Sequence, residues 1–232
     1  MMTIRPARER GDGKLDWLKT RYSFSFADYY DPTHMGFKSL RVLNEDWIAP
    51  NGGFDTHGHR DMEVVTYLLN GAIAHKDSTG SASTLIPGTV QRMTAGKGIR
   101  HSEFNPSSTT ELHLLQIWIL PEKEGLTPGY EERAFPLSDR QGKWQLIASP
   151  NGRENSLTIH QQVDLFASQL ESGDALAHTL KPNHSAWLQV ARGELLLNGQ
   201  TVKTGDGVAL ENEPELNLSS KTESELLLFD FS

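Results

Sequence analysis

Residues 57–71 read HGHRDMEVVTYLLNG, and they are the most informative segment of the chain. Its second half, Glu63 to Leu69, is rich in β-branched, aromatic and leucine residues and ends at Asn70-Gly71. Such a run predicts a β-strand that closes in a tight turn. His57 and His59 stand one residue apart ahead of it. Because residues i and i+2 of a strand point to the same face, a strand here directs both imidazoles one way.

A second pair with the same spacing, His101 and Glu103, follows the glycine-rich turn at residues 94–98. If the two strands are neighbours in one sheet, three imidazoles and a carboxylate meet around one point. These ligands suit a first-row divalent metal such as Fe, Mn, Co, Ni or Cu. Two strand histidines alone more often bind nothing, but the turns that precede both pairs favour a ligand set. We therefore expect one mononuclear metal site.

The composition narrows the class of protein. At 232 residues, the chain suffices for one large β domain or two small ones. It has no cysteine, which excludes disulfides, thiolate ligands and a cysteine nucleophile. A net charge of −8 without a basic cluster disfavours direct nucleic-acid binding. No stretch looks like a signal peptide or a membrane helix, so we expect a cytoplasmic monomer with no membrane partner.

Short apolar runs separated by Gly, Pro, Asn and Asp recur along the chain, while long helical periods are absent. This pattern predicts an all-β sandwich or barrel. Asn198-Gly199 predicts a two-residue hairpin turn between strands at 194–197 and 200–203. One short helix is expected, at 163–169. The remaining strands are expected at 40–44, 63–69, 89–93, 112–119, 145–148, 157–161, 186–191, 207–210 and 225–231.

A polar stretch with several prolines and glycines, between Pro121 and Lys143, divides the chain. We expect an N-terminal domain that carries the metal over residues 1–125, a linker over 126–143 and a C-terminal domain over 144–232.

The two halves resemble each other weakly. In each, a strand ends at a glycine (Gly71 or Gly193), and turn glycines follow at a similar distance. This similarity suggests a duplicated β module. In the second copy, Thr179 and Lys181 stand where the first has its two histidines. We therefore expect the second copy to lack the metal chemistry.

Longer motifs support a family assignment. The run Gly52 to Gly71 resembles the first cupin motif, with Glu63 four residues after the second histidine, and Gly88 to Gly96 resembles the second. Residues 93–103, MTAGKGIRHSE, taken together with His57 and His59, resemble the motifs of the pirin family. The closest similarity is to bacterial pirin-like proteins assigned quercetin dioxygenase activity, and it is most detailed over residues 1–120. At position 58 this chain has glycine, where many relatives have proline.

The resemblance implies two tandem cupin barrels in one chain, with one divalent transition metal in the N-terminal barrel. Iron is expected first, with Mn, Co, Ni, Cu or Zn as alternatives. The residues at the family's ligand positions are His57, His59, His101 and Glu103.

The resemblance also implies a dioxygenase that opens the heterocyclic ring of flavonols such as quercetin with O₂ and releases carbon monoxide. Its partners would be a small planar aromatic substrate and O₂, and Glu103 would be the catalytic base. The alternative is a metal-binding co-regulator of the pirin type without physiological quercetinase activity. A metal retained only for stability is a third reading, although structural sites usually leave no open coordination position.

Two glutamates compete for the fourth ligand position. The general cupin motif would use Glu63, whereas the pirin pattern uses Glu103. At about 3.3 Å per residue, Glu63 lies roughly 13 Å along its strand from His59, and Glu103 only about 6.5 Å from His101. We favour Glu103, and we expect Glu63 to accept a hydrogen bond from a ligand imidazole.

The other histidines are expected to lie outside the metal site. His113 lies in an apolar strand and should be a hydrogen-bonded core or pocket residue, whereas His75 should face solvent or the barrel rim. Three histidines in the second half lack partners at ligand spacing: His160, His178 and His184. Gln116 and Trp118 share a strand face and are candidates for the wall of the substrate pocket.

Overall fold

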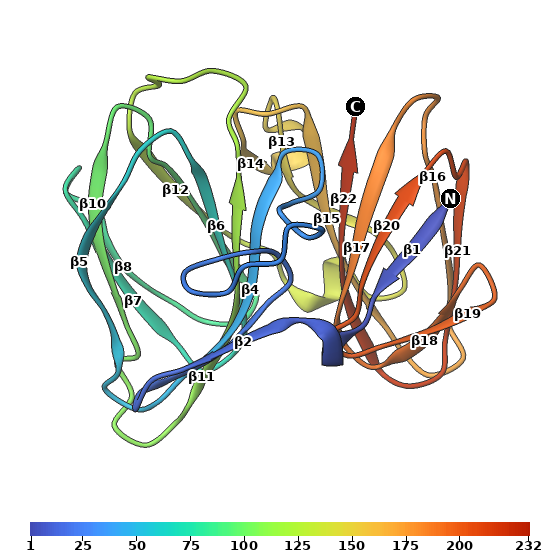
Figure 1. Cartoon of the computed structure of the whole chain (residues 1–232), viewed down its shortest axis with the longest axis horizontal. Coiled ribbons are helices and arrows are strands. Elements are labelled where there is room, and N and C mark those ends of the chain that lie inside the picture. Colours follow the sequence, from blue (N-terminus) through green and yellow to red (C-terminus); the bar gives the residue numbers. More distant parts are fainter. The chain divides into compact units, whose positions relative to one another are not determined.

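The computed structural model describes residues 1–232, and its regular secondary structure is almost entirely β-strand (Figure 1). The chain forms two compact units. The N-terminal unit comprises residues 11–135 and 157–161, and the C-terminal unit comprises 1–10, 136–156 and 162–232. The helical segments are three 3₁₀ turns of three residues each, η1 (Ala7–Glu9), η2 (Leu137–Asp139) and η3 (Arg153–Asn155). None of them is long and apolar enough to cross a membrane.

The N-terminal unit is a sandwich of two antiparallel sheets (Figure 1). Its strands are β2 (Gly11–Lys14), β3 (Leu18–Tyr22), β4 (Leu40–Ile48), β5 (Gly53–His59), β6 (Glu63–Asn70), β7 (Ile73–Asp77), β8 (Ala82–Leu85), β9 (Thr89–Thr94), β10 (Ile99–Phe104), β11 (Leu112–Ile119) and β12 (Gly129–Ala134). The two-residue strand β14 (Leu157–Thr158) falls in the same unit but outside its two sheets. One sheet has the order β12-β9-β6-β11-β4-β3-β2, and the other has the order β5-β10-β7-β8. Leucine and isoleucine side chains from both sheets, among them Leu68, Ile73 and Leu114, pack between them.

The C-terminal unit repeats this topology. Its strands are β1 (Met2–Arg5), β13 (Gln145–Ser149), β15 (Val163–Leu170), β16 (Ala175–Thr179), β17 (Ser185–Arg192), β18 (Glu194–Leu197), β19 (Gln200–Lys203), β20 (Gly207–Glu211), β21 (Glu215–Ser220) and β22 (Ser224–Phe231). The order β1-β20-β17-β22-β15-β13 corresponds strand for strand to β12-β9-β6-β11-β4-β3, and β16-β21-β18-β19 corresponds to β5-β10-β7-β8. The chain therefore contains two cupin barrels, in agreement with the expected fold class and with the suggested duplication.

Most of the expected strands are present. β11 and β18 have the expected bounds, whereas the strand expected at 157–161 is only two residues long. The hairpin turn at Asn198-Gly199 is confirmed, because β18 pairs with β19 and both turn residues have positive φ, 46° and 82°.

The helix expected at 163–169 is wrong, because this segment is β15. Val163, Leu165 and Ala167 are buried, and Asp164 and Phe166 between them are partly exposed. This is the two-residue period of a strand, and pairing with β22 along its whole length satisfies the backbone.

Three segments lie elsewhere than the expected domain boundaries placed them. Residues 126–143, expected as a linker, include β12, which pairs with β9 in the N-terminal unit. Residues 1–10 belong to the C-terminal unit, since β1 pairs with the edge of β20 and so satisfies that strand's backbone groups. Residues 157–161 belong to the N-terminal unit.

Candidate metal centre

The two strands that carry the candidate ligands are neighbours, as the sequence led us to expect. β5 and β10 pair antiparallel, with His101 opposite His57 and Ile99 opposite His59. The register shifts between His101 and Glu103, so that Glu103 lies opposite Phe54. Such an irregularity changes the direction of a side chain locally. The pairing brings donors that are more than forty residues apart in the chain onto one face.

The three imidazoles converge through their Nε2 atoms. His101 Nε2 lies 3.1 Å from His57 Nε2 and 2.9 Å from His59 Nε2. His57 Nδ1 lies 2.8 Å from the carbonyl oxygen of Asp55, which can only accept, so Nδ1 carries the proton and Nε2 presents a lone pair. A single proton on His101 Nε2 could be donated to only one of its two neighbours, His57 Nε2 or His59 Nε2. A cation among the three nitrogens can accept every lone pair, so this donor set fits a transition metal.

Burial keeps the rings of His59 and His101 neutral. It lowers the pKa of His59 to about 4, with the nearby His57 acting in the same direction. It also lowers the pKa of His101 to about 4, against the opposing effect of Glu103. Neutral imidazole is the form that binds a metal, so both rings are ready to coordinate at neutral pH without losing a proton.

Glu103 projects from β10 into the barrel and is held by the opposite sheet. Its Oε1 accepts a hydrogen bond from Gln91 Nε2, and its Oε2 accepts one from Gln116 Nε2, each at 2.9 Å. Thr66 lies between these glutamines in the register of the sheet and hydrogen-bonds to both. Since each carboxylate oxygen has a further lone pair, Glu103 can accept these bonds and still bind a metal.

A fourth histidine, which the sequence argument missed, lies behind the centre. His75 was expected to face solvent or the rim, but it is 2% exposed and lies directly opposite Glu103 on β7. Its Nε2 is 3.1 Å from Asp77 Oδ2, its Nδ1 is 3.9 Å from Glu103 Oε1, and its ring stacks on Tyr130. His75, His101 and Glu103 form a second group of donors within 4.8 Å of one another.

Charge in this second group opposes the effect of burial. Burial alone would lower the pKa of His75, but Glu103 and Asp77 outweigh it and raise that pKa. Burial would likewise raise the pKa of Glu103, but contact with His75 and the nearby His101 lower it. Glu103 therefore remains ionised at neutral pH. The spacing of His75 and Asp77, one residue apart on a strand, is the same signal that identified His57 and His59.

Glu63 has different contacts from those expected. It is fully buried, but its carboxylate lies 3.3 Å from His160 Nδ1 and accepts a hydrogen bond from Thr94, rather than binding a ligand imidazole. His160 belongs to the 157–161 segment of the same unit. His113, expected to be hydrogen-bonded, lies 2.9 Å from Glu45 and stacks on Trp47.

Two histidines of the C-terminal unit are paired with one acid. His178 Nε2 lies 3.0 Å from Asp230 Oδ2, and His184 Nδ1 lies 2.6 Å from Asp230 Oδ1. They do not come together with a third ligand, since both groups of three close metal donors lie in the N-terminal unit.

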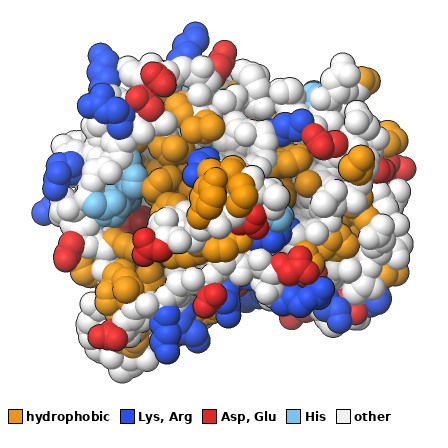
Figure 2. Space-filling view, in the orientation of Figure 1, with side chains coloured by type: hydrophobic (Ala, Val, Ile, Leu, Met, Phe, Trp, Pro, Cys, Tyr) orange, Lys and Arg blue, Asp and Glu red, His pale blue; other side chains and the backbone are white.

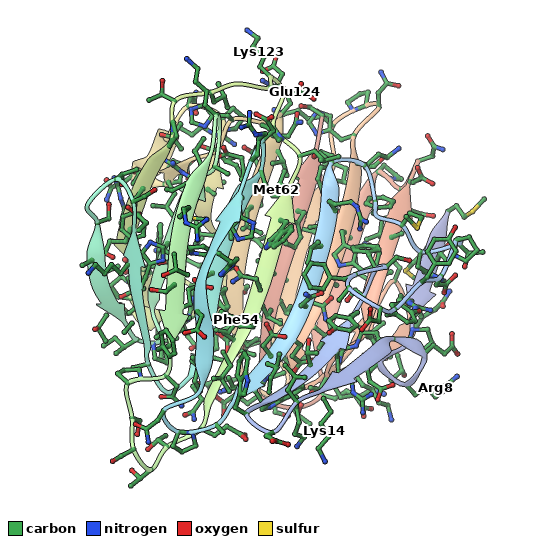
Figure 3. All side chains as sticks on the ribbon, turned by 60° about the vertical axis from the view of Figure 1, so that its left-hand side comes forward. Arg8, Lys14, Phe54, Met62, Lys123 and Glu124 are labelled. Atoms are coloured by element: carbon green, nitrogen blue, oxygen red, sulfur yellow. The ribbon has the colours of Figure 1, made fainter.

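His57, His59 and His101 line a cavity of about 310 Å³ inside the N-terminal barrel. This volume is at the small end of the ~300–1,000 Å³ range of ligand sites. Gln116 and Trp118, proposed from strand parity, line the cavity, as does Phe54 on β5 (Figure 3). Figure 2 shows histidine side chains at the surface of this unit beside hydrophobic ones. The arrangement places three candidate metal ligands, His57, His59 and His101, in the wall of a largely apolar pocket.

Comparison with known proteins agrees with this architecture. Residues 3–119 match the family model described as Pirin, and residues 146–231 match the model described as quercetinase C-terminal cupin domain. The chain belongs to the pirin family. Its pirin relatives include quercetin 2,3-dioxygenase from Escherichia coli K12, 46% identical over 99% of this chain and 98% of that protein. A pirin-like protein from Caulobacter vibrioides is 37% identical over 99% of each chain.

A solved pirin structure agrees in fold and carries a metal. The bacterial pirin YhhW from Escherichia coli, in complex with nickel(II), is 44% identical to this chain and superposes with a TM-score of 0.95, covering 100% of this chain and 99% of that one. A pirin fold that holds a transition metal, together with the donors described above, supports a single transition-metal centre in this chain.

Proposed function

We propose that this chain is a metal-dependent dioxygenase that opens the heterocyclic ring of flavonols such as quercetin, using O₂ and releasing carbon monoxide. The observation that carries the proposal is the convergence of three imidazole Nε2 atoms on the wall of an apolar cavity. The quercetin 2,3-dioxygenase name of the 46% identical relative supports the choice of substrate.

In this proposal His57, His59, His101 and Glu103 hold one divalent ion, with iron expected first. Three neutral imidazoles and one carboxylate leave a net charge of +1 on such an ion, which favours an anionic oxygen ligand. A bound ion would supply Lewis acidity and redox chemistry toward O₂.

The remaining steps fall to the chain's own side chains. Glu103 is the base that takes the proton of the substrate's 3-hydroxyl group at a carboxylate oxygen. Gln91 and Gln116 fix the position of that carboxylate, since each holds one of its oxygens. Phe54 and Trp118 belong to the apolar wall that holds the planar ring system and excludes water.

The proposal is tested with metal-free protein reloaded with one ion at a time, from Fe, Mn, Co, Ni, Cu and Zn. Three readouts are followed together, namely O₂ consumption, loss of quercetin's visible absorbance and release of carbon monoxide. At least one loaded form should give all three in equal amounts, and His101→Ala protein treated in the same way should give none. A protein that binds metal stoichiometrically but turns over no flavonol with any ion would contradict the proposal and favour the co-regulator reading.

A further inference from the structure

The metal cavity has a second polar wall, which the proposed mechanism leaves unused. Thr20 on β3 and Asp46 on β4 are paired across the two strands, and both line the cavity, as does Asn44. These residues belong to the seven-stranded sheet, whereas the histidines belong to the four-stranded sheet. Glu45, between Asn44 and Asp46 on the strand, contacts His113 instead and does not line the cavity.

The wall has hydrogen-bonding capacity that the protein does not use. Asp46 and Asn44 are each 4% exposed. The Asn44 Oδ1 and Trp118 Nε1 atoms are buried and have no hydrogen-bond partner, although both residues line the cavity. Buried polar atoms in folded proteins nearly always have partners, so unpaired atoms in residues that line a cavity indicate that a polar ligand group binds close by.

Asp46 is suited to bind a hydroxyl group. Burial raises its pKa to about 7, with the nearby Glu103 and Glu45 acting in the same direction and the neighbouring Thr20 hydroxyl opposing them. A carboxyl group in this environment can accept a hydrogen bond when ionised or donate one when protonated.

We propose that Asp46, with Thr20 and Asn44, binds a second hydroxyl group of the substrate and thereby makes the pocket specific for polyhydroxylated planar aromatics. The inference rests on the proposed function, in which a first hydroxyl group is directed to the metal. A ligand with only that first hydroxyl leaves the buried wall unmatched, and a site built to hydrogen-bond a hydroxyl rejects an analogue that lacks it.

Two flavonols distinguish the contact of the first hydroxyl with the metal from the contact of a second hydroxyl with Asp46. Quercetin and 3-hydroxyflavone share the hydroxyl beside the carbonyl group, but only quercetin carries hydroxyls elsewhere on its rings. Their dissociation constants are measured by anaerobic absorbance titration of the metal-loaded protein, so that no turnover occurs. Wild-type protein should bind quercetin about 10-fold more tightly or better, the effect of roughly one hydrogen bond to a buried group.

Four variants test the wall. Asp46→Leu should weaken quercetin binding about 10-fold and leave 3-hydroxyflavone binding within about 2-fold. Asp46→Asn, whose amide still donates and accepts hydrogen bonds, should keep most of the preference for quercetin over 3-hydroxyflavone. Thr20→Val, which keeps the shape of the side chain, should reduce the preference even if Asp46→Leu does not fold. Glu45→Gln changes a buried acid on the same strand but outside the cavity, and it should alter neither constant.

The outcomes distinguish the inference from the function on which it rests. Equal losses for both flavonols in Asp46→Leu, or no selective loss in Asp46→Leu and Thr20→Val, would overturn the role of this wall and leave the proposed function standing. A metal-loaded wild-type protein that binds neither flavonol would overturn the proposed function and this inference with it.

Discussion

The Nε2 atoms of His59 and His101 lie 2.9 Å apart, although the two residues are 42 positions apart in the sequence. His101 Nε2 is also 3.1 Å from His57 Nε2, so His101 is the candidate ligand whose nitrogen lies close to both others. A metal site at this position depends on His101 more directly than on any other histidine of the chain.

Replacing His101 with alanine should therefore remove metal binding. We expect about one transition-metal ion per chain in the wild type and close to none in His101→Ala, measured by elemental analysis after dialysis against a weak chelator. His113→Ala is the control, because His113 contacts Glu45 and Trp47 rather than a ligand. Two ions bound tightly per wild-type chain would contradict the single-site assignment.

The two glutamates should respond differently to conversion into glutamine. Glu103→Gln should keep much of the histidine scaffold but lose quercetin turnover, because the amide cannot act as a base. Glu63→Gln should keep the metal and lower turnover by less than the roughly 10- to 100-fold typical of residues that support ligands, because Glu63 contacts Thr94 and His160 instead. Metal content and turnover are measured side by side. Loss of metal in Glu63→Gln, with both properties retained in Glu103→Gln, would reverse the assignment in favour of the general cupin pattern.

Gln116→Leu should destabilise the N-terminal barrel. It removes the donor to Glu103 Oε2 and leaves a buried carboxylate oxygen without that partner, at a cost of about 1–3 kcal/mol. Urea unfolding of metal-free protein measures the loss. Gln200→Leu, on an exposed position of β19, is the control and should be close to neutral. An unchanged urea midpoint of unfolding in Gln116→Leu would show that the hydrogen bond from Gln116 to Glu103 contributes nothing to stability.

In metal-free protein, His101 should stabilise the fold less as the pH falls. Its pKa is about 4 in the folded state and near ~6.5 when unfolded, so the unfolded chain takes up the proton first. The stability advantage of the wild type over His101→Gln should be fully present above about pH 6.5 and should shrink between pH 6.5 and 4. Thermal melting of both chains across this range measures it, and a constant difference would mean that His101 titrates normally.

Asp46 should act with the opposite sign over nearly the same range. Its pKa is raised from 3.8 to about 7, so the folded state holds the proton longer than the unfolded chain, and stability is lost as the pH rises through that window. Asp46→Asn should gain stability relative to the wild type between pH 4 and 7 and show a constant difference at higher pH. Because the two effects oppose each other, each is measured as the difference between the wild type and its variant rather than from the wild-type curve alone. A difference that does not vary with pH would place the pKa of Asp46 near its ordinary value.

The fold could be predicted largely from alternation and turn residues. β11 follows from a short apolar run, and the turn at Asn198-Gly199 follows from residues that favour positive φ. β15 could not be distinguished from a helix over eight residues, because Phe166 and Ser168 on its second face are not consistently polar. Pairing with β22, which only the tertiary structure provides, decides the outcome.

The candidate site was predictable where two metal donors lie one residue apart on the same strand. It was less predictable where a strand contributes a single polar residue. The pairs His57 and His59, and His101 and Glu103, are recognisable from spacing alone. Gln91 and Gln116 are single polar residues in apolar strands, and nothing in their own sequence surroundings shows that they meet one carboxylate. Their contact arises because residues distant in the chain face each other across the barrel.

Glu103 belongs to one sheet and is held by glutamines of the other, so the position of this candidate ligand depends on how far apart the two sheets lie. A core substitution that widens the barrel by a fraction of an ångström would shift the carboxylate relative to the three imidazoles without touching any of them. The optical or paramagnetic spectrum of a bound ion would register that shift. In this family member, the metal's spectrum can therefore serve as a gauge of barrel geometry, readable in variants whose activity is unchanged.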